Sequence, residues 1–441
     1  MRRRDFLAAL ACAPLPAAAQ AAAGRAPRHL KITDVKVVVT NPNRAPLGNY
    51  VLVKILTSEP GLYGWGDATC SGSELGVAKF VEEHLRPALI GRNPMRLEDI
   101  WQTLFLLPYY RSGSVHMSAL SGIDMALWDI KGKVAGLPVY ELLGGRARSR
   151  LLTYTSVGGR DFRQVEEGAR RAMERGYKVI KVQVAPPGAD SGYAVPPSER
   201  QRAATQKAHE AGVPPLETWE PAPYVRTLPK LFEHLRKTLG EDIELLHDVH
   251  ERIAPHQALW LAKALEPYNL FFLEDPLRPE HLDTFRLIRK QSSIPIAMGE
   301  IWTGQWDGLF LITEHLIDYV RHDLCHCGGI TTGRKIATIA EPYGILTAWH
   351  GPSNISPIAQ MANCHVSLSV ANFGIQECAT NWSEAAREVF STAPTFREGY
   401  VDIGDQPGLG IEVNEQAAAK YPYLARHRPT VRRADDSAWP Y

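Results

Sequence analysis

The sequence predicts an α/β protein in which a parallel (β/α) barrel follows a smaller α+β domain. Its 441 residues, 45% of them hydrophobic, are too many for one small domain and enough to bury a large core. From Leu151 onward, short apolar segments alternate with amphipathic helical patterns, as in a chain of βα units. No G-x-G-x-x-G turn follows any of these segments, which disfavours a doubly wound nucleotide-binding sheet.

The first 23 residues predict a cleaved signal peptide. A charged start, MRRRD, precedes a short apolar stretch from Phe6 and small residues around Ala17 to Ala23. The apolar core is shorter than the roughly 20 residues that cross a bilayer, and no later segment qualifies, so we expect no membrane span. The Arg-Arg-x-Phe-Leu order at Arg3 to Leu7 resembles a twin-arginine (Tat) signal, which implies export of the folded protein to the periplasm. A Sec signal with incidental arginines is the alternative.

Charge and cysteine content exclude several function classes. The chain has 49 basic and 48 acidic residues and no block rich in Lys and Arg, so we expect no nucleic-acid partner. Five cysteines remain once Cys12 leaves with the signal, and an odd number argues against a complete disulfide framework. Cys325 and Cys327 alternate along an expected strand with no second pair nearby, which favours packing over metal binding.

Residues 29–148 predict the α+β domain. HLKITDVKVVVTN and NYVLVKILTSEPGLYGWGDAT are rich in β-branched residues and read as strands of a meander joined at a Glu-Pro-Gly turn. Apolar residues then recur at three- and four-residue steps in ELGVAKFVEEHLRPALI, RLEDIWQTLFLL and MSALSGIDMALWDIKGKVAG, which predicts three helices.

Eight apolar segments predict the barrel strands, separated for the most part by helical patterns. They are LLTYTSV (151–157), KVIKVQ (178–183), IELLHDV (243–249), LFFLED (270–275), IPIAMGE (294–300), DYVRHDL (318–324), ILTAWHG (345–351) and FGIQEC (373–378). The Pro- and Gly-rich segment VAPPGADSGYAVPPSER after the second strand predicts a long loop over the substrate.

Three acids at successive strand ends predict a metal site. Asp248, Glu274 and Glu300 are each separated from the next by 26 positions, so a parallel barrel brings their carboxylates to one mouth. Three uncompensated carboxylates would repel each other, and Mg²⁺ is the hard cation that such oxygen ligands favour, although zinc stays open. His250, two residues after Asp248 on the expected strand, faces the same side, whereas His247 points toward a helix.

These residues resemble the enolase superfamily, and within it the mannonate dehydratase-like members, also called D-galactonate dehydratase-like. The segments SGIDMALWDIKGKVAGLPVYELLGG, LHDVHER, FLEDPL, MGE, GGIT, WHGPSNISP and NFGIQE stand in family order over nearly the whole mature chain. The resemblance implies a capping domain at 29–148, a modified enolase-type (β/α) barrel at 149–400, and a segment 401–441 that packs back on the cap. It also implies a Mg²⁺ cofactor, a small-molecule sugar acid as ligand, and a homo-oligomer.

The resemblance further implies dehydration of a hexonate, such as D-mannonate or D-gluconate, to the 2-keto-3-deoxy acid through an enediolate. By this resemblance, Asp248, Glu274 and Glu300 bind Mg²⁺. His250 is the acid, and Tyr193 is the base, with Lys181 beside it. The sugar acid is bound by Asn49, Arg321, His350 and Glu377. Three positions depart from the family pattern: Lys181 replaces the usual arginine, Ser156 a histidine, and Asn354 an aspartate.

Two other functions compete with dehydration. Lys181 and His350 would lie on opposite sides of the mouth, with Asp323 orienting His350, an arrangement that resembles mandelate racemase and would give racemisation or epimerisation. A non-catalytic sugar-acid-binding or sensing protein that keeps the metal site is the other alternative, and the three departures favour it. His250 beside the metal favours dehydration over racemisation or epimerisation.

Overall fold

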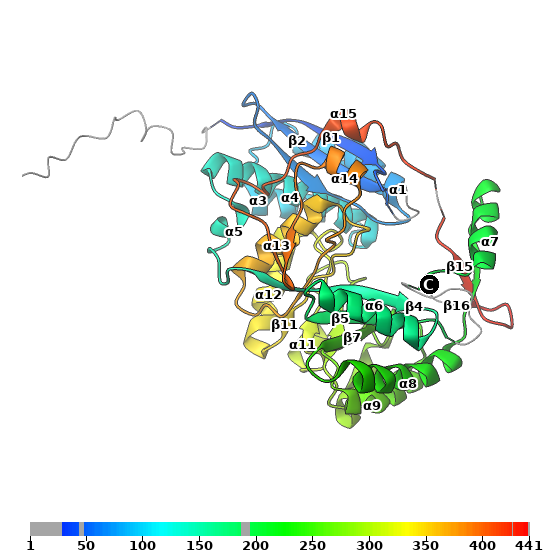
Figure 1. Cartoon of the computed structure of the whole chain (residues 1–441). Coiled ribbons are helices and arrows are strands. Elements are labelled where there is room, and N and C mark those ends of the chain that lie inside the picture. The colour runs from blue at the N-terminus through cyan, green and yellow to red at the C-terminus, as the bar shows by residue number, and fades with distance from the viewer. Residues whose placement is uncertain (1–28, 44–47, 187–194, 426, 440–441) are drawn as a thin grey trace, which may run out of the picture.

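The computed structural model describes residues 29–43, 48–186, 195–425 and 427–439. The expected signal peptide lies outside these ranges. The capping domain carries an antiparallel sheet in the order β1-β2-β3, with its helices packed on one side (Figure 1). Its elements are β1 (Ile32–Thr40), β2 (Tyr50–Thr57), β3 (Tyr63–Asp67), α1 (Glu74–Phe80), a π-helical turn (Val81–Leu85), α2 (Arg86–Leu89), α3 (Leu97–Leu106), α4 (Ser114–Ala135) and α5 (Val139–Leu142).

Helix α4 joins the cap to the barrel. Glycines allow it to lie directly on the sheet: a Cβ on Gly66 would be 1.9 Å from the Gly122 carbonyl oxygen, and one on Gly64 would be 2.0 Å from that of Ala126. The opposite side of α4 contacts the barrel helix α12 (Gly329–Ala340). There the buried Asp124 carboxylate accepts hydrogen bonds from the Thr331 backbone N–H (3.0 Å) and hydroxyl (2.5 Å). Helix α4 is therefore buried on two sides, which explains its almost continuous run of small and apolar residues.

The predicted (β/α) barrel is confirmed. Eight strands pair in parallel in the order β11-β10-β9-β8-β7-β5-β4, and β12 closes the ring by pairing with β4. An isolated bridge from Thr347 to Phe373 completes the circuit. The strands are β4 (Leu151–Gly159), β5 (Val179–Val184), β7 (Glu244–Asp248), β8 (Leu273–Glu274), β9 (Ile296–Met298), β10 (Tyr319–Val320), β11 (Leu346–Thr347) and β12 (Gln376–Glu377).

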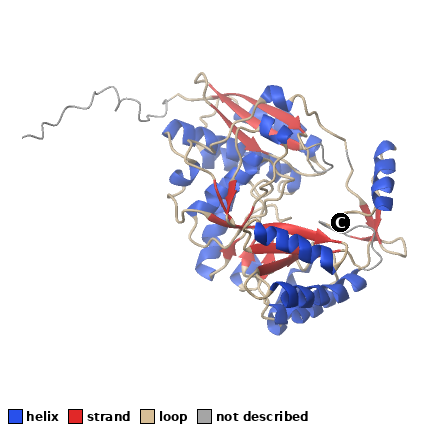
Figure 2. Cartoon of the chain, in the orientation of Figure 1, coloured by secondary structure: helices blue, strands red, loops and turns tan. Residues whose placement is uncertain are grey.

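Helices surround this ring (Figure 2). They are α6 (Phe162–Glu174), α8 (Pro221–Leu239), α9 (Pro255–Leu265), α10 (Phe285–Gln291), α11 (Leu309–Thr313), α12 and α13 (Pro357–Ser369). Each predicted strand segment overlaps an observed strand, although four of the observed strands, β8, β10, β11 and β12, have only two residues. No helix among the described residues is both long and apolar enough to cross a membrane.

An insertion follows β5 and meets the end of the chain. The expected loop is described only up to residue 186 and from residue 195, and α7 (Glu199–Glu210) and β6 (Leu216–Thr218) follow it. Strand β15 (Thr430–Arg432) pairs in parallel with β6 and antiparallel with β16 (Ala438–Trp439). Residues 430–439 thus lie against the barrel insertion, which departs from the expectation that all of 401–441 packs on the cap, because the edge of β6 offers free backbone partners.

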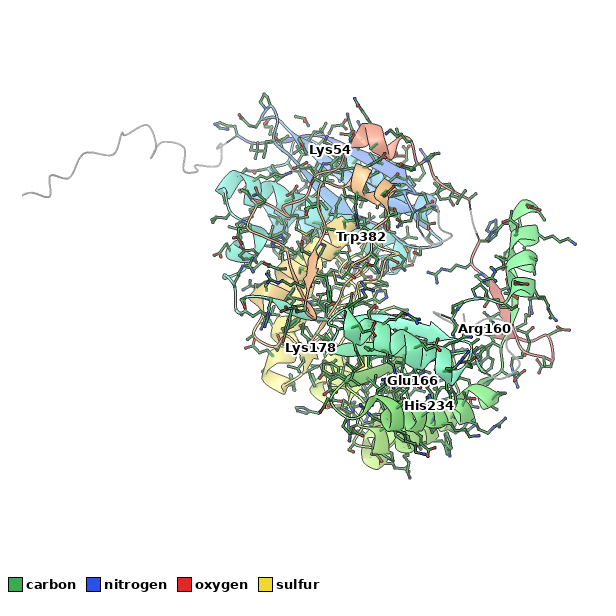
Figure 3. All side chains as sticks on the ribbon, viewed as in Figure 1. Lys54, Arg160, Glu166, Lys178, His234 and Trp382 are labelled. Atoms are coloured by element: carbon green, nitrogen blue, oxygen red, sulfur yellow. The ribbon has the colours of Figure 1, made fainter. Side chains whose placement is uncertain are left out.

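The preceding residues do contact the capping domain. Helix α14 (Glu384–Val389) and the hairpin of β13 (Thr395–Arg397) and β14 (Tyr400–Asp402) lead to α15 (Glu415–Ala418), and β14 pairs with β4 of the barrel. Lys54 of β2 forms an ion pair with Glu415 of α15; Figure 3 labels Lys54 on the cap. The Thr40 hydroxyl donates to the carbonyl of Ala418 at 3.0 Å. The chain end therefore runs from the cap to the barrel insertion.

Candidate active site

The carboxyl ends of three adjacent strands bring the predicted acids together. Asp248 ends β7 and pairs in register with Glu274, which ends β8, while Glu300 follows β9. Ligand atoms of Asp248, His250 and Glu300 lie within 4.8 Å of one another, and so do those of Glu274, Asp275 and Glu300. Asp275 was not predicted, although its place after Glu274 in FFLEDP was a signal for it.

This acid cluster fits Mg²⁺. Burial and the neighbouring carboxylate of Asp248 raise the pKa of Glu274 well above its usual range, despite the opposing charge of Arg321. Burial and Glu300 likewise raise the pKa of Asp275, whose Oδ2 atom accepts no hydrogen bond within the described part of the chain. A hard divalent cation relieves both the like-charge repulsion and the orphaned oxygen, and carboxylate oxygens are the ligands Mg²⁺ prefers.

Two buried cations stand beneath the acids. Lys181 of β5 places Nζ 3.1 Å from Asp248 Oδ2, 3.3 Å from Glu274 Oε2 and 3.4 Å from Glu377 Oε1. Arg321 places Nη2 2.7 Å from Glu274 Oε1 and 2.8 Å from Glu377 Oε2. Lys181 and Arg321 outweigh the effect of burial and lower the pKa of Glu377. Lys181, Arg321 and Glu377 form one ion-pair network in the barrel interior, and none of them lines the cavity between the barrel mouth and the cap.

His250 faces Asp248, but not by the predicted route. Strand β7 ends at Asp248, and His250 and Glu251 have left-handed backbones with φ of 51° and 60°. The His250 backbone N–H donates to Asp248 Oδ1 at 2.9 Å, and its Nε2 lies 3.0 Å from Asp248 Oδ2. A tight turn rather than strand alternation therefore brings the two side chains together; such strained backbones cluster at functional sites.

His247 points away from the site, as predicted. Its Nε2 lies 2.6 Å from the Tyr224 hydroxyl on α8, and its Nδ1 lies 2.7 Å from the Val182 carbonyl oxygen. Burial lowers the pKa of His247 to about 4, so this imidazole is neutral at neutral pH. His247 therefore joins the barrel wall to an outer helix and takes no part in the chemistry.

His350 is held between two carboxylates. Its Nδ1 lies 2.7 Å from Asp323 Oδ2, and its Nε2 lies 3.3 Å from Glu300 Oε2. Burial lowers the pKa of His350, but the charges of Glu300 and Asp323 prevail and raise it to about 9. The pairing with Asp323 is the one expected from the sequence, and the imidazole is a charged donor at neutral pH.

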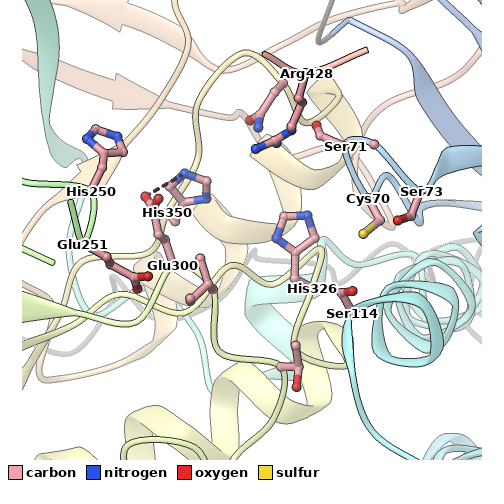
Figure 4. Close-up of a pocket in the computed structure, with 14 residues that line it drawn as sticks. Cys70, Ser71, Ser73, Ser114, His250, Glu251, Glu300, His326, His350 and Arg428 are labelled. Carbon is pink, nitrogen blue, oxygen red and sulfur yellow. Dashed lines mark ion pairs between the residues drawn. The ribbon is translucent and has the colours of Figure 1, made fainter. Parts of the chain in front are cut away.

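A cavity of about 460 Å³ opens between the barrel mouth and the cap (Figure 4). The barrel contributes His250, Glu251, Glu300 and His350. Residues 70–73, Ser114 and Arg428 close the other side. The volume lies within the range typical of small-molecule sites.

Glu251 is a cavity residue that sequence reasoning missed. Burial, followed by the charges of Asp275 and Glu300, raises its pKa to about 10. Nothing in the pattern HDVHER distinguished it from a surface glutamate, because its burial depends on the turn at His250 and on packing from neighbouring strands.

The remaining predicted positions differ in where they lie. Asn354 lines the cavity, whereas Ser156 is exposed on β4. Asn49 is buried in the cap, where its side chain bonds to both the N–H and the carbonyl of Leu424 at 2.9 Å. Tyr193 lies outside the described residues. Substrate binding by Asn49 and proton removal by Tyr193 stay predictions.

The cysteines pack in the interior. The five described cysteines are free and buried. Cys325 Sγ lies 3.3 Å from the Asp67 carbonyl oxygen, and no cysteine belongs to a potential metal-binding group within the described ranges. This arrangement agrees with the packing interpretation of Cys325 and Cys327.

Comparison with known proteins identifies the family. Residues 29–144 match the N-terminal domain of mandelate racemase / muconate lactonizing enzyme, and residues 164–417 match the enolase C-terminal domain-like family. A D-galactonate dehydratase family member from Pantoea ananatis is 47% identical, covering 93% of this chain and 99% of the relative. A D-mannonate dehydratase from Caulobacter vibrioides is 44% identical over 92% of this chain and 98% of its own.

A solved structure has the same fold. The crystal structure of an enolase from Pantoea ananatis with bound D-gluconate and Mg is 45% identical, has a TM-score of 0.85, and covers 93% of this chain and 100% of its own. The chain therefore belongs to the enolase superfamily and, within it, to the D-galactonate dehydratase family.

Proposed function

We propose that this protein removes water from a hexonate, such as D-mannonate or D-gluconate, and forms the 2-keto-3-deoxy acid. Sugar acid dehydration with Mg²⁺ follows from its relatives, which include a D-mannonate dehydratase and an enolase with bound D-gluconate and Mg. The observation that carries the proposal is His250, which lines the cavity with Nε2 3.0 Å from the metal-site carboxylate of Asp248. An acid beside the metal is what loss of a hydroxyl requires and what racemisation does not.

The residues of the cavity have separate tasks. When bound, Mg²⁺ supplies a Lewis acid that stabilises negative charge on the substrate carboxylate as the α-proton leaves. His250 Nε2 gives a proton to the hydroxyl that departs from C3. His350, charged between Asp323 and Glu300, places a positive charge at the cavity wall that attracts an anionic substrate oxygen. Asp248 orients His250 through both its backbone and its ring.

Tyr193 remains our proposed base. Lys181 has less freedom to assist it than the sequence suggested, because its ammonium is engaged by three carboxylates in the barrel interior. Lys181 lacks the planar fork of an arginine, and an ammonium held this way acts as a fixed counter-charge.

The racemase-like alternative is weakened by the same contacts. It needs Lys181 or His350 to take a proton from the α-carbon. Lys181 does not line the cavity, and although burial opposes them, the carboxylates of Asp248, Glu274 and Glu377 raise its pKa so that it stays protonated. The pKa of His350 is raised to about 9, so this imidazole is also protonated at neutral pH. Both groups therefore lack the free lone pair of a base at neutral pH.

The test follows the α-proton and the product together by proton NMR in D₂O, with a panel of hexonates and Mg²⁺. We expect His250→Asn to lower product formation by about 10²- to 10⁴-fold while α-proton exchange continues. We expect Tyr193→Phe to stop both. His256→Asn, at an exposed position on α9, is the matched control and should behave as wild type.

Three outcomes would contradict the proposal. Full product formation by His250→Asn would show that His250 is not the acid. Exchange that needs Lys181 or His350 but not Tyr193 would favour the racemase-like mechanism. Binding without turnover across the whole panel would instead favour the sugar-acid-binding protein.

Export and assembly are further proposals. We infer a Tat signal from Arg3 to Leu7, so replacing Arg3 and Arg4 with lysines should keep the protein in the cytoplasm. We also infer a homo-oligomer, supported by the exposure of Tyr109 (85%), Tyr110 (93%) and Trp306 (50%) on one chain. Cell fractionation tests the first, and light scattering of the purified protein tests the second; normal periplasmic recovery or a monomer would overturn them.

A further inference from the structure

The hairpin of β15 and β16 carries an indole ring to the loops at the barrel mouth (Figure 1). Val431 of β15 pairs with Glu217 of β6 on one side and with Trp439 of β16 on the other. The hairpin is tied to the barrel beyond these strands as well, because the Ala434 N–H donates to Glu220 Oε1 at 2.8 Å. Trp439 therefore has a fixed position on a sheet that its hairpin shares with the barrel insertion.

Trp439 contacts the loops that follow two strands of the metal site. Its indole N–H donates to the Arg252 carbonyl oxygen at 2.8 Å, four residues after Asp248 ends β7. The guanidinium carbon of Arg278, four residues after Glu274 ends β8, lies 5.9 Å from the centroid of the indole ring. A cation at this distance from an aromatic face is attracted to it. One side chain thus joins the segments that leave the ends of β7 and β8.

The carbonyl that Trp439 binds belongs to the turn that presents the proposed acid. His250 and Glu251 have left-handed backbones, with φ of 51° and 60°. Such a conformation costs free energy in residues with side chains and persists where surrounding contacts hold it. The Glu251 N–H donates to the Asp275 carbonyl oxygen at 2.9 Å, which holds the middle of the turn. The Trp439 indole holds its last residue, Arg252.

We propose that Trp439 is a positioning residue, which holds the turn at residues 250–252 so that His250 Nε2 faces the hydroxyl that departs from the substrate. This inference rests on the proposed dehydration and adds the group that orients its acid. Trp439 is not among the described residues that line the cavity, so it acts through Arg252. The placement matters because an acid must lie within hydrogen-bond reach of the leaving oxygen, and an error of about 1 Å can lower the rate about 100-fold.

The same hairpin also supports the barrel insertion. Strand β15 pairs with β6, and the proposed base, Tyr193, precedes β6 in the insertion. Loss of the whole hairpin would therefore disturb acid and base together. Loss of the indole N–H removes the bond to Arg252 and leaves the pairing of β15 in place. The two roles give different results, because a misplaced acid slows departure of the hydroxyl, whereas a misplaced base slows loss of the α-proton.

The experiment compares wild type with Trp439→Phe, which keeps an aromatic ring but loses the N–H donor, and with Trp439→His, which keeps a donor on a smaller ring. Proton NMR in D₂O with Mg²⁺ and a panel of hexonates follows α-proton exchange and product together. Mass spectrometry of backbone hydrogen–deuterium exchange, without substrate, follows residues 249–254. Trp128→Phe is the matched control, because the Trp128 indole donates a hydrogen bond of 2.9 Å to the Thr331 hydroxyl at the α4–α12 contact.

We expect Trp439→Phe to lower product formation about 10- to 100-fold while α-proton exchange changes by less than about 3-fold. The amides of residues 250–252 should exchange about 3- to 10-fold faster, because the turn has lost one neutral hydrogen bond. Trp439→His should recover part of both losses, and Trp128→Phe should match wild type in both measurements.

A parallel fall of exchange and product in Trp439→Phe would overturn the inference and indicate that the hairpin serves the insertion. Product formation equal to wild type, or unchanged amide exchange at the turn, would overturn it as well. If wild type dehydrates no hexonate, the proposed function fails, and the amide exchange still decides whether Trp439 holds the turn.

Discussion

The two ends of the cavity are built in different ways. At the metal end, Asp248 and Glu274 close adjacent barrel strands, are fully buried, and meet the buried cations Lys181 and Arg321. At the cap end, a turn before α1, the first residue of α4 and an exposed arginine from the chain end meet across the cavity. The first end is one cooperative unit of the barrel; the second is assembled from three separate segments.

This difference separates chemistry from selectivity. Removing one member of a buried ion pair lowers the stability of the fold, because the remaining charge is left without a partner. Loops and chain ends on a rigid scaffold tolerate substitution and carry recognition. We therefore expect substitutions at the metal end to abolish turnover or destabilise the fold, and those at the cap end to change which substrate is used.

The largest expected effect is at Glu274. Glu274→Gln keeps the side-chain shape but removes one carboxylate from the cluster, so kcat/KM should fall by at least about 10³-fold. In wild type, Mg²⁺ at about 100 times its Kd should add about 2.7 kcal/mol to stability, and this gain should vanish in the variant. Steady-state kinetics and thermal unfolding with and without Mg²⁺ measure both. The exposed Glu233→Gln on α8 is the control; retained Mg²⁺ stabilisation in Glu274→Gln would refute the site.

The next effect concerns the counter-charge below the acids. Lys181→Met leaves Asp248, Glu274 and Glu377 without their shared ammonium, and breaking such a buried pair costs about 3–5 kcal/mol. We expect a large fall in the denaturation midpoint without metal and partial recovery with Mg²⁺, since the ion neutralises part of the same charge. Lys237→Met, at an exposed helix position, serves as the reference. A midpoint equal to wild type would mean that the carboxylates do not depend on Lys181.

A smaller effect is expected at the cap end. Asn49→Ala removes both bonds to Leu424 and should loosen the segment that presents Arg428, so KM should rise about 10-fold with kcat nearly unchanged. The double variant with Arg428→Met distinguishes two roles for Asn49. If Asn49 acts through Arg428, the double variant is no worse than Arg428→Met alone; additive losses would indicate that Asn49 contacts the sugar acid directly, as the sequence implied.

The smallest effect on turnover is expected at the α4–α12 contact, which joins the cap to the barrel. Burial raises the pKa of Asp124 at the α4–α12 contact to about 7 from 3.8. The protonated carboxyl is thus favoured in the folded state, and its contribution to stability is complete below about pH 4 and lost as pH rises to about 7. Asp124→Asn should therefore gain stability relative to wild type across this window and stay level above it. Denaturant titrations from pH 4 to 8 measure the difference, with the exposed Asp283→Asn as control; a flat difference would contradict the assignment.

The sequence by itself determined the barrel, the acid cluster and the direction of His247. These follow from short-range patterns: strands repeat at regular spacing, and an acid at the end of each parallel strand can only reach the common mouth. Asp248, Glu274 and Glu300 were therefore predictable from their spacing alone. The alternation of side chains along β7 likewise predicted that His247 points toward a helix, and the structure shows that this helix is α8.

Tertiary structure decided the rest. Alternation along a strand predicted the meeting of His250 with Asp248 for the wrong reason. Strand β7 ends at Asp248, two residues before His250, and a left-handed turn brings the two side chains together. Glu251 and Asp275 owe their altered pKa values to burial by distant segments, which no local pattern records. Arg428 lies more than 350 residues from the turn it covers, and the pairing of β15 with β6 and the bonds between Asn49 and Leu424 bring it to the cavity. Contacts between segments so far apart depend on how the whole chain closes, and local sequence carries no signal for them.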